Sequence, residues 1–194
     1  KRVVIKSGTA KFAVRVLEPD AYPTIGNPNE DGCAFDIGAK DFASLFEVTN
    51  YAAGRDVVAG PAFHGVHLHA KGGRLIGVAS DTKRLGLTSV ALPKGAEGLP
   101  DKGLTVPLDG VKELGRLLKE LDEVVTVSVS KGLIRLQTPT LTFTSRLLDA
   151  QFVDYARIIP KVNGGGATVH PVAFKDALDR AAVVYASGLH KYEP

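Results

Sequence analysis

Three stretches of the chain combine a short alternating strand with an amphipathic helix. They begin at Ala34, Leu104 and Ala167. In each stretch, apolar and polar residues first alternate and then give way to apolar residues every three or four positions, which is typical of a helix packed on a core. The starts lie roughly 65 residues apart, which is longer than the repeats of solenoid proteins. The spacing therefore indicates a small fold that is repeated within the chain.

The helical period also predicts which side chains face the core. These are Phe42, Leu45, Phe46 and Thr49 in the first helix, Val111, Leu114, Leu117, Leu118 and Leu121 in the second, and Phe174, Ala177, Leu178, Ala181 and Tyr185 in the third. Asp109 is a plausible N-cap of the second helix because a carboxylate can accept a free backbone N–H there. Pro171 suits the first turn of the third helix.

Strands follow each of the first two helices. Residues 125–129, 134–136 and 141–145 alternate between apolar and polar, and Lys131-Gly132 and Thr138-Pro139 give turns between them. The earlier half repeats the pattern over 66–68, 75–79 and 85–90, with a turn at 71–73. Such alternation is typical of antiparallel sheets with one solvated face. The predicted fold class is α+β, an internally repeated unit with two helices packed on antiparallel sheets.

The ends of the repeated units predict the domain boundaries. Residues 12–22 resemble residues 143–155, since both join an arginine-bearing strand to a loop with aspartate and tyrosine. We therefore expect 1–25 to be the tail of a preceding domain and 32–160 to be a complete two-unit domain. Linkers are predicted at 26–29 and 164–166, and a further domain at 167–194. The chain contains no Met, so we expect it to be part of a longer protein.

Composition excludes several classes of protein. Hydrophobic residues make up 44% of the 194 residues, which argues against disorder. No apolar run approaches the ~20 residues that a membrane span needs. Cys33 is the single cysteine. We therefore expect neither a disulfide framework nor a cysteine-based zinc site, and we expect the protein to be in a reducing compartment. The net charge of +3 permits a polyanionic partner without requiring one.

Candidate catalytic groups are few. His67 and His69 share one face of a predicted strand and His64 is out of phase, so a solvent-facing pair is favoured over a zinc site. Asp81 and Asp154 stand beside basic residues, which favours ion pairing over acid–base chemistry. A phosphate-binding loop and a nucleophile elbow are absent from the sequence. We therefore expect a protein that is not an enzyme and that has no cofactor and no metal.

Two longer motifs give a family resemblance. Gly73-Arg-Leu-Ile-Gly-Val-Ala-Ser-Asp-Thr-Lys-Arg-Leu-Gly86 resembles a bacterial clamp signature in which a strand runs into Thr/Ser-Asp-x-x-Arg-Leu. Residues 141–160 are similar to the clamp segment that ends Phe-Pro-Asp-Tyr-x-Arg-Val-x-Pro. The resemblance is to the bacterial beta sliding clamp, the beta subunit of DNA polymerase III, centred on its middle domain. It implies the DNA-clamp fold and a homodimeric ring that encircles duplex DNA as a processivity factor in DNA replication.

The resemblance also implies a groove that binds short client peptides. Its middle-domain wall would consist of Phe63, Ser80, Thr82, Lys83, Arg84, Leu85, Val153, Arg157 and Ile158. Apolar members of this set could line a shallow pocket, and the two arginines could hold the peptide. Many family members have Gly-His at Thr82-Lys83 and proline at Val153. The alternative is that Arg84 and Arg157 only form structural ion pairs with Asp81 and Asp154.

Candidate DNA contacts lie on the helices. Lys112, Arg116 and Lys119 are spaced i, i+4 and i+7, which places them in one stripe. Such a stripe can hold phosphates without reading bases, as a sliding protein requires. Lys40 and Arg55 are further candidates. The alternative is an ordinary solvated helix face with Glu113 and Glu120 beside the cations.

The implied partners follow from the resemblance. They are duplex DNA bound without sequence preference, the DNA polymerase III catalytic subunit, the clamp loader and other clamp-binding peptides, with no membrane. The implied location is the bacterial cytoplasm, associated with the nucleoid. A clamp-like scaffold that binds proteins without encircling DNA is the alternative function, and an unrelated α+β enzyme is a third, disfavoured class.

Overall fold

The computed structural model describes residues 1–18, 21, 32–55, 60–130, 132–160, 164 and 166–186. The chain divides into two compact units, Lys1–Val153 and Asp154–Pro194. The first unit begins with an antiparallel hairpin of β1 (Arg2–Ser7) and β2 (Ala10–Arg15). The second contains helix α3 (Pro171–Ala186). The predicted linker at 26–29 lies outside the described residues, and so does part of the one at 164–166.

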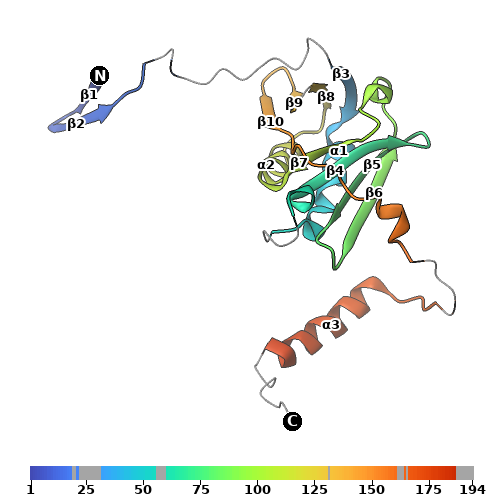
Figure 1. The fold of residues 1–194 in the computed structure, drawn as a ribbon. Helices are drawn as coiled ribbons and strands as arrows, with labels where there is room; N and C mark the ends of the chain where they lie inside the picture. The colour runs from blue at the N-terminus through green and yellow to red at the C-terminus, as the bar shows by residue number, and fades with distance from the viewer. Residues whose placement is uncertain are drawn as a thin grey trace. The chain divides into compact units, whose positions relative to one another are not determined.

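Residues 33–146 contain the same series of elements twice, a strand, a helix and three further strands (Figure 1). The first series is β3 (Cys33–Gly38), α1 (Ala39–Glu47), β4 (Gly65–Lys71), β5 (Arg74–Ser80) and β6 (Leu85–Ala91). The second is β7 (Leu104–Pro107), α2 (Leu108–Lys119), β8 (Val124–Ser130), β9 (Leu133–Gln137) and β10 (Thr142–Arg146). The α+β fold predicted from the sequence is confirmed.

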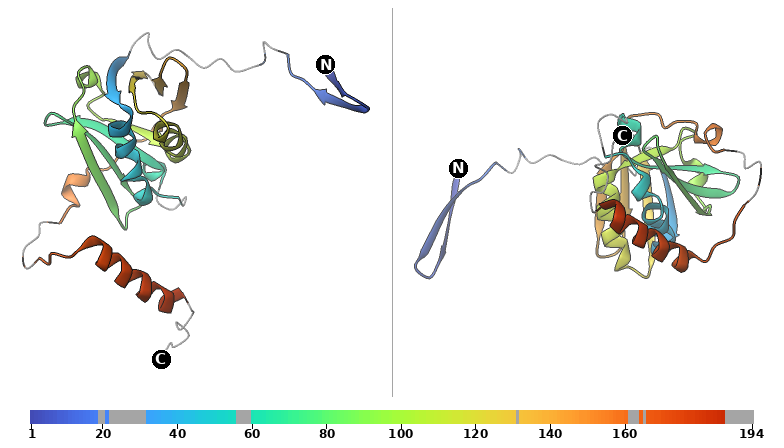
Figure 2. Two further views of the ribbon diagram at one scale, coloured as in Figure 1. Left: turned by 180° about the vertical axis from the view of Figure 1, so that it is seen from behind. Right: turned by 90° about the horizontal axis from the view of Figure 1, so that it is seen from below.

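The two halves exchange their first strands. The strand orders of the two sheets are β10-β9-β8-β3 and β6-β5-β4-β7. Each sheet therefore holds three consecutive strands of one half and the opening strand of the other, and every pairing in them is antiparallel. Helices α1 and α2 pack against each other, as the further views in Figure 2 also show.

Hydrogen bonds at corresponding positions of the two halves repeat as well. The first helical N–H of α1, on Ala39, donates to Glu123 O at 2.9 Å, and the first of α2, on Leu108, donates to His64 O at 2.9 Å. After the third strand of each meander, Leu92 N donates to Gly73 O at 3.0 Å and Leu147 N donates to Gly132 O at 2.8 Å. The two halves therefore share the same topology and the same pattern of backbone hydrogen bonds at these positions.

A single hydrophobic core joins both sheets and both helices. The residues predicted for the first helix are all buried, and so are Val111, Leu114 and Leu118 of the second. Leu121 is partly buried against this core. Burial of these large side chains stabilises the fold by roughly 1.5–3 kcal/mol each before the entropy of ordering is subtracted.

Several details differ from the prediction. Asp109 lies within the first turn of α2 rather than capping it, because β7 runs straight into the helix at Pro107 and the His64 carbonyl takes the first N–H. Leu117 is only partly buried. The predicted core face of α3 is exposed, including Phe174, Leu178 and Tyr185. An amphipathic sequence shows which face would be buried, but burial itself needs a partner surface.

Candidate functional site

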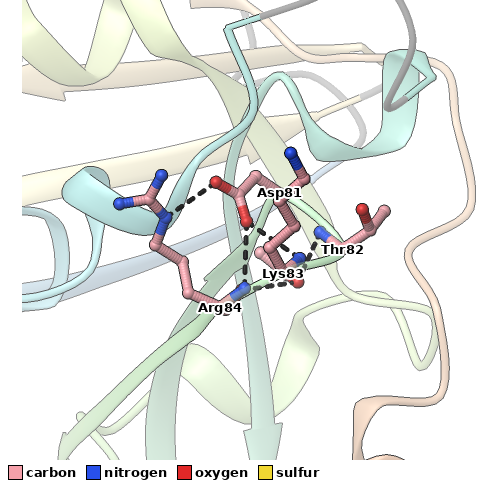
Figure 3. A network of polar contacts seen from close by, with 5 residues as sticks. Asp81, Thr82, Lys83 and Arg84 are labelled. Atoms are coloured by element: carbon pink, nitrogen blue, oxygen red, sulfur yellow. Dashed lines mark hydrogen bonds and ion pairs between the residues drawn. The ribbon is translucent and has the colours of Figure 1, made fainter. Parts of the chain in front are cut away.

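The turn between β5 and β6 is held by a compact network of polar contacts (Figure 3). Asp81 Oδ1 accepts hydrogen bonds from the backbone N–H groups of Lys83 and Arg84, each at 3.0 Å. Its Oδ2 accepts one from Arg84 Nε at 2.8 Å. Ser80 Oγ accepts from Thr82 N at 3.2 Å and donates to Arg84 O at 2.9 Å. The Asp81 carboxylate and the Ser80 hydroxyl thus fix the backbone of residues 80–84, most of which belong to the predicted groove wall.

The electrostatics of Asp81 follow from this network. Burial alone would raise the pKa of its carboxyl, but the hydrogen bonds from Arg84 and Lys83 outweigh that effect and lower it. The ion pair between Arg84 and Asp81 therefore exists, as the alternative interpretation of the sequence expected. It leaves the Arg84 side chain largely exposed, so the guanidinium keeps donors that a ligand could use.

Thr82 has an unusual backbone conformation. Its φ is +75°, the one positive φ of a residue other than glycine among the described residues. A β-branched side chain is strained in this left-handed region. A glycine at this position would adopt the same turn without that cost. The residues around Thr82 are therefore arranged to hold a strained conformation.

Two further residues of the predicted groove wall, Phe63 and Val153, lie beside Phe152. Phe63 ends a 3-10 turn (Pro61–Phe63), and its ring lies 5.9 Å from that of Phe152 between centroids. Phe152 is 7% exposed, whereas the next residue, Val153, is 38% exposed. Leu85 is partly buried at the start of β6. Apolar side chains with accessible edges thus lie on segments that are anchored in the core.

The remaining predicted groove residues belong to the second compact unit. Arg157 closes a 3-10 turn (Tyr155–Arg157), and its Nε lies 2.9 Å from Asp154 Oδ2. Ile158 follows it and is exposed. Burial, and next the charge of Asp154, raise the pKa of Tyr155. This turn carries one exposed cation and one exposed apolar side chain.

The four cations predicted on the helices are all exposed, and each has an acidic neighbour. Lys112 lies 3.2 Å from Asp109, and Arg116 lies 3.1 Å from Glu113, both within α2. The other two pairs are Lys40 with Asp122 at 2.8 Å and Lys119 with Glu47 at 3.4 Å. Exposed pairs of this kind stabilise a fold by only about 0–1 kcal/mol, so these cations stay available to a stronger anionic partner.

Arg55 and Lys112 line one surface depression. Its other lining residues include Leu108 and Asp109 at the start of α2, together with His64 and Leu148. The sequence did not link Arg55 to the stripe on the second helix, because the two positions are far apart in the chain. The fold brings them to the same depression.

Sequence reasoning was wrong about His67 and overlooked Phe152. His67 is 6% exposed rather than solvent-facing, and burial, and next the charge of His69, lower its pKa to about 4. His69 is partly buried. The period-2 pattern placed both residues on one face of the strand, but that face is covered here by Phe152. The sequence signal for Phe152 was its position directly before Val153, within the segment 141–160 that resembles the clamp motif.

Among the residues that the structure describes, no group of three or more His, Cys, Asp or Glu side chains could hold a metal ion. Within the same ranges, no helix combines the length and the apolar composition that crossing a membrane requires. Burial raises the pKa of the Cys33 thiol, which opposes formation of a reactive thiolate.

The doubled strand–helix–meander unit, with its two helices side by side, defines a sliding-clamp domain. Among solved structures, a Bartonella birtlesii DnaN sliding clamp bound to griselimycin matches 92% of this chain and 48% of its own, with a TM-score of 0.80 and 31% identity. A Caulobacter crescentus beta sliding clamp matches 94% of this chain and 49% of its own, with a TM-score of 0.81 and 29% identity.

The sequence comparisons agree. The family model for the DNA polymerase III beta subunit, central domain, matches residues 36–154, so the chain belongs to this family. The beta sliding clamp of Caulobacter vibrioides is 30% identical over 191 residues, covering 95% of this chain and 50% of the relative. That of Escherichia coli is 27% identical over 184 residues. The chain spans about half the length of the curated relatives it matches.

Proposed function

We propose that the protein containing this chain is a DNA replication processivity factor, a clamp that encircles duplex DNA and tethers DNA polymerase III and other clients. The observation that carries the proposal is the match to beta sliding clamps along 95% of the chain. In this proposal residues 1–25 end a first clamp domain, 32–160 form the middle one and 167–194 begin a third. The protein acts as a homodimeric ring in the bacterial cytoplasm and is a non-catalytic accessory subunit.

The proposed mechanism is geometric. A closed ring leaves DNA only at an end or by opening, so its contacts with phosphates can stay weak and sliding stays easy. The exposed cations of α1 and α2, already partly neutralised by acidic neighbours, suit such weak contacts. Lys40, Arg55, Lys112, Arg116 and Lys119 are the proposed DNA-facing residues.

Client docking is proposed at a groove wall that consists of Phe63, Ser80, Thr82, Lys83, Arg84, Leu85, Val153, Arg157 and Ile158. A peptide with apolar anchors and a polar backbone needs accessible apolar edges beside fixed donors. The turn held by Asp81 supplies the donors and the segment after Phe152 supplies an apolar edge. The partners would be the polymerase III catalytic subunit, the clamp loader and other proteins with clamp-binding peptides.

One experiment tests the DNA-facing assignment. Lys112, Arg116 and Lys119 are changed together to glutamate in the complete gene product, and loading onto DNA and polymerase processivity are measured. We expect both to fall, by roughly tenfold or more at moderate salt, because three attractions become three repulsions. A matched control reverses the exposed Lys71, Lys94 and Lys102, which lie outside the helices. Unchanged processivity in the helix variant would overturn the assignment.

A second experiment tests the groove. A clamp-binding peptide is titrated into the complete gene product while NMR signals of Phe63, Leu85, Arg157 and Ile158 are followed. These signals should shift together with one dissociation constant, since they form one surface in the proposal. Signals that stay in place at saturating peptide would refute the groove.

A protein-binding scaffold that does not encircle DNA is the second candidate function. The observation that favours it is the acidic partner beside each helix cation. The charge-reversal experiment discriminates the two, because a scaffold would keep client binding and show no dependence on the helix cations.

A further inference from the structure

Three neighbours fix the ring of His67 on β4 in the interior of the first unit, and a fourth, His69, lies 5.6 Å from it between ring centroids. Its ring is stacked on Phe152, with 4.7 Å between centroids and 6° between ring planes. Its Nδ1 lies 3.0 Å from Thr105 Oγ1 in a buried hydrogen bond. The third neighbour is Gly103, where an added Cβ would lie 2.5 Å from His67 Nε2. The imidazole is thus fixed in position and in plane.

Phe152 connects this ring to the proposed groove wall. Its other ring neighbour is Phe63 at 5.9 Å, and Val153 follows it in the chain. The segment that leads to Phe152 is itself attached to β7, since Leu148 N donates to Thr105 O at 2.9 Å. Thr105 therefore fixes the imidazole through its hydroxyl, and it fixes the segment before Phe152 through its carbonyl.

We propose that His67 is a positioning residue of the peptide groove, which stacks on Phe152 and so fixes the places of Phe63 and Val153. The inference rests on the proposed client groove. A pocket that must be complementary to a peptide anchor needs side chains fixed to within about 0.5 Å. The planar imidazole supplies this by parallel stacking, while its hydrogen bond to Thr105 prevents rotation.

The chemistry of the site favours a histidine over an aliphatic residue in this role. Burial keeps the imidazole neutral because it lowers its pKa to about 4, so no charge is buried beneath the groove. A leucine would fill similar space but would define no ring plane for Phe152. If His67 were only a filler of the core, an apolar residue of similar volume would serve as well.

The test compares His67→Leu with His67→Phe in the complete gene product. The probe is fluorescently labelled griselimycin, which a clamp relative binds. We expect His67→Leu to weaken binding by about tenfold and His67→Phe, which keeps a stacking ring, to stay within about twofold of the parent. In addition, the methyl NMR signals of Val153 should move in the leucine variant and remain near their original positions in the phenylalanine variant.

Two controls separate the possible outcomes. Val127→Ala on β8 removes buried volume from the core cluster, of which Phe152 is not a member. An equal loss of binding in this variant would therefore show a general loss of stability and overturn the proposal. Leu85→Asp should abolish binding. If it does while His67→Leu binds normally, the positioning role is wrong and the groove stands. If Leu85→Asp has no effect, the groove itself is wrong, and the positioning role is wrong with it.

Discussion

Lys119 on α2 and Glu47 at the end of α1 form an ion pair that joins the two helices, with 3.4 Å between Nζ and Oε1. Lys119 belongs to an exposed row of cations on α2 with Lys112 and Arg116, and Arg116 is paired with Glu113 of the same helix. The two helices therefore present alternating charges to solvent. This arrangement moderates the attraction of the surface for a polyanion.

If this surface of α1 and α2 faces DNA, removing the acidic side chains beside the cations should strengthen DNA binding. We expect Glu47→Gln together with Glu113→Gln to raise affinity for duplex DNA and to steepen the dependence of log K on log salt by about one unit for each cation that gains a phosphate. Filter binding of the complete gene product over a range of salt concentrations measures this. An unaltered slope would mean that these cations do not contact phosphates.

Thr82→Gly should stabilise the protein. The substitution relieves a β-branched residue at a φ of +75°, and this relief outweighs the greater entropy of glycine in the unfolded chain. We expect a gain of roughly 0.5–1 kcal/mol in the free energy of unfolding by urea denaturation. Thr88→Gly is the matched control. Thr88 lies inside β6, and its replacement should destabilise by a similar amount. A loss at Thr82 would show that the strain is absent.

The burial of His67 predicts a pH dependence of stability. The unfolded chain takes up a proton on this residue near pH 6.5, whereas the folded state does so only near pH 4. Stability contributed by the neutral form is therefore complete above pH 6.5 and is lost as pH falls toward 4, by at most roughly 3 kcal/mol.

Urea denaturation between pH 7 and pH 4 measures this loss. His67→Phe should flatten the curve in that window, because the variant has no proton to bind there. His69 also has a pKa lowered by burial, so His69→Gln serves as the comparison and should remove a smaller part of the slope. Equal curves for parent and His67→Phe would contradict the prediction.

Two glycines should respond in opposite ways to alanine. At Gly65 on β4 an added Cβ would lie 2.1 Å from Val106 O on β7. Gly65→Ala must therefore push β7 away from β4, and it should lower the free energy of unfolding by roughly 3 kcal/mol or more. Gly115 lies inside α2 with nothing within 4 Å, and Gly115→Ala should add roughly 0.5–1 kcal/mol. Thermal unfolding of the two variants tests both signs.

The sequence predicted periodic features well and long-range pairings poorly. The core faces of α1 and α2 and the meander strands follow from local period, because one face of each element is buried. The exchange of β3 and β7 between the sheets has no local signal, since a strand pattern does not name its partner. His67 was misplaced for the same reason. Period gave its face, whereas Phe152, which covers that face, comes from 85 positions further along the chain.

The exchanged opening strands also limit how such a molecule can be divided. A protein cut between β6 and β7 would leave β4 without its outer neighbour and β3 without β8, so each piece would lose an edge that only the other can supply. We therefore expect the two halves to melt in one transition. Although the same series of elements occurs twice, the smallest unit that we expect to fold is the pair of halves, because the opening strand of a single half has no sheet to join.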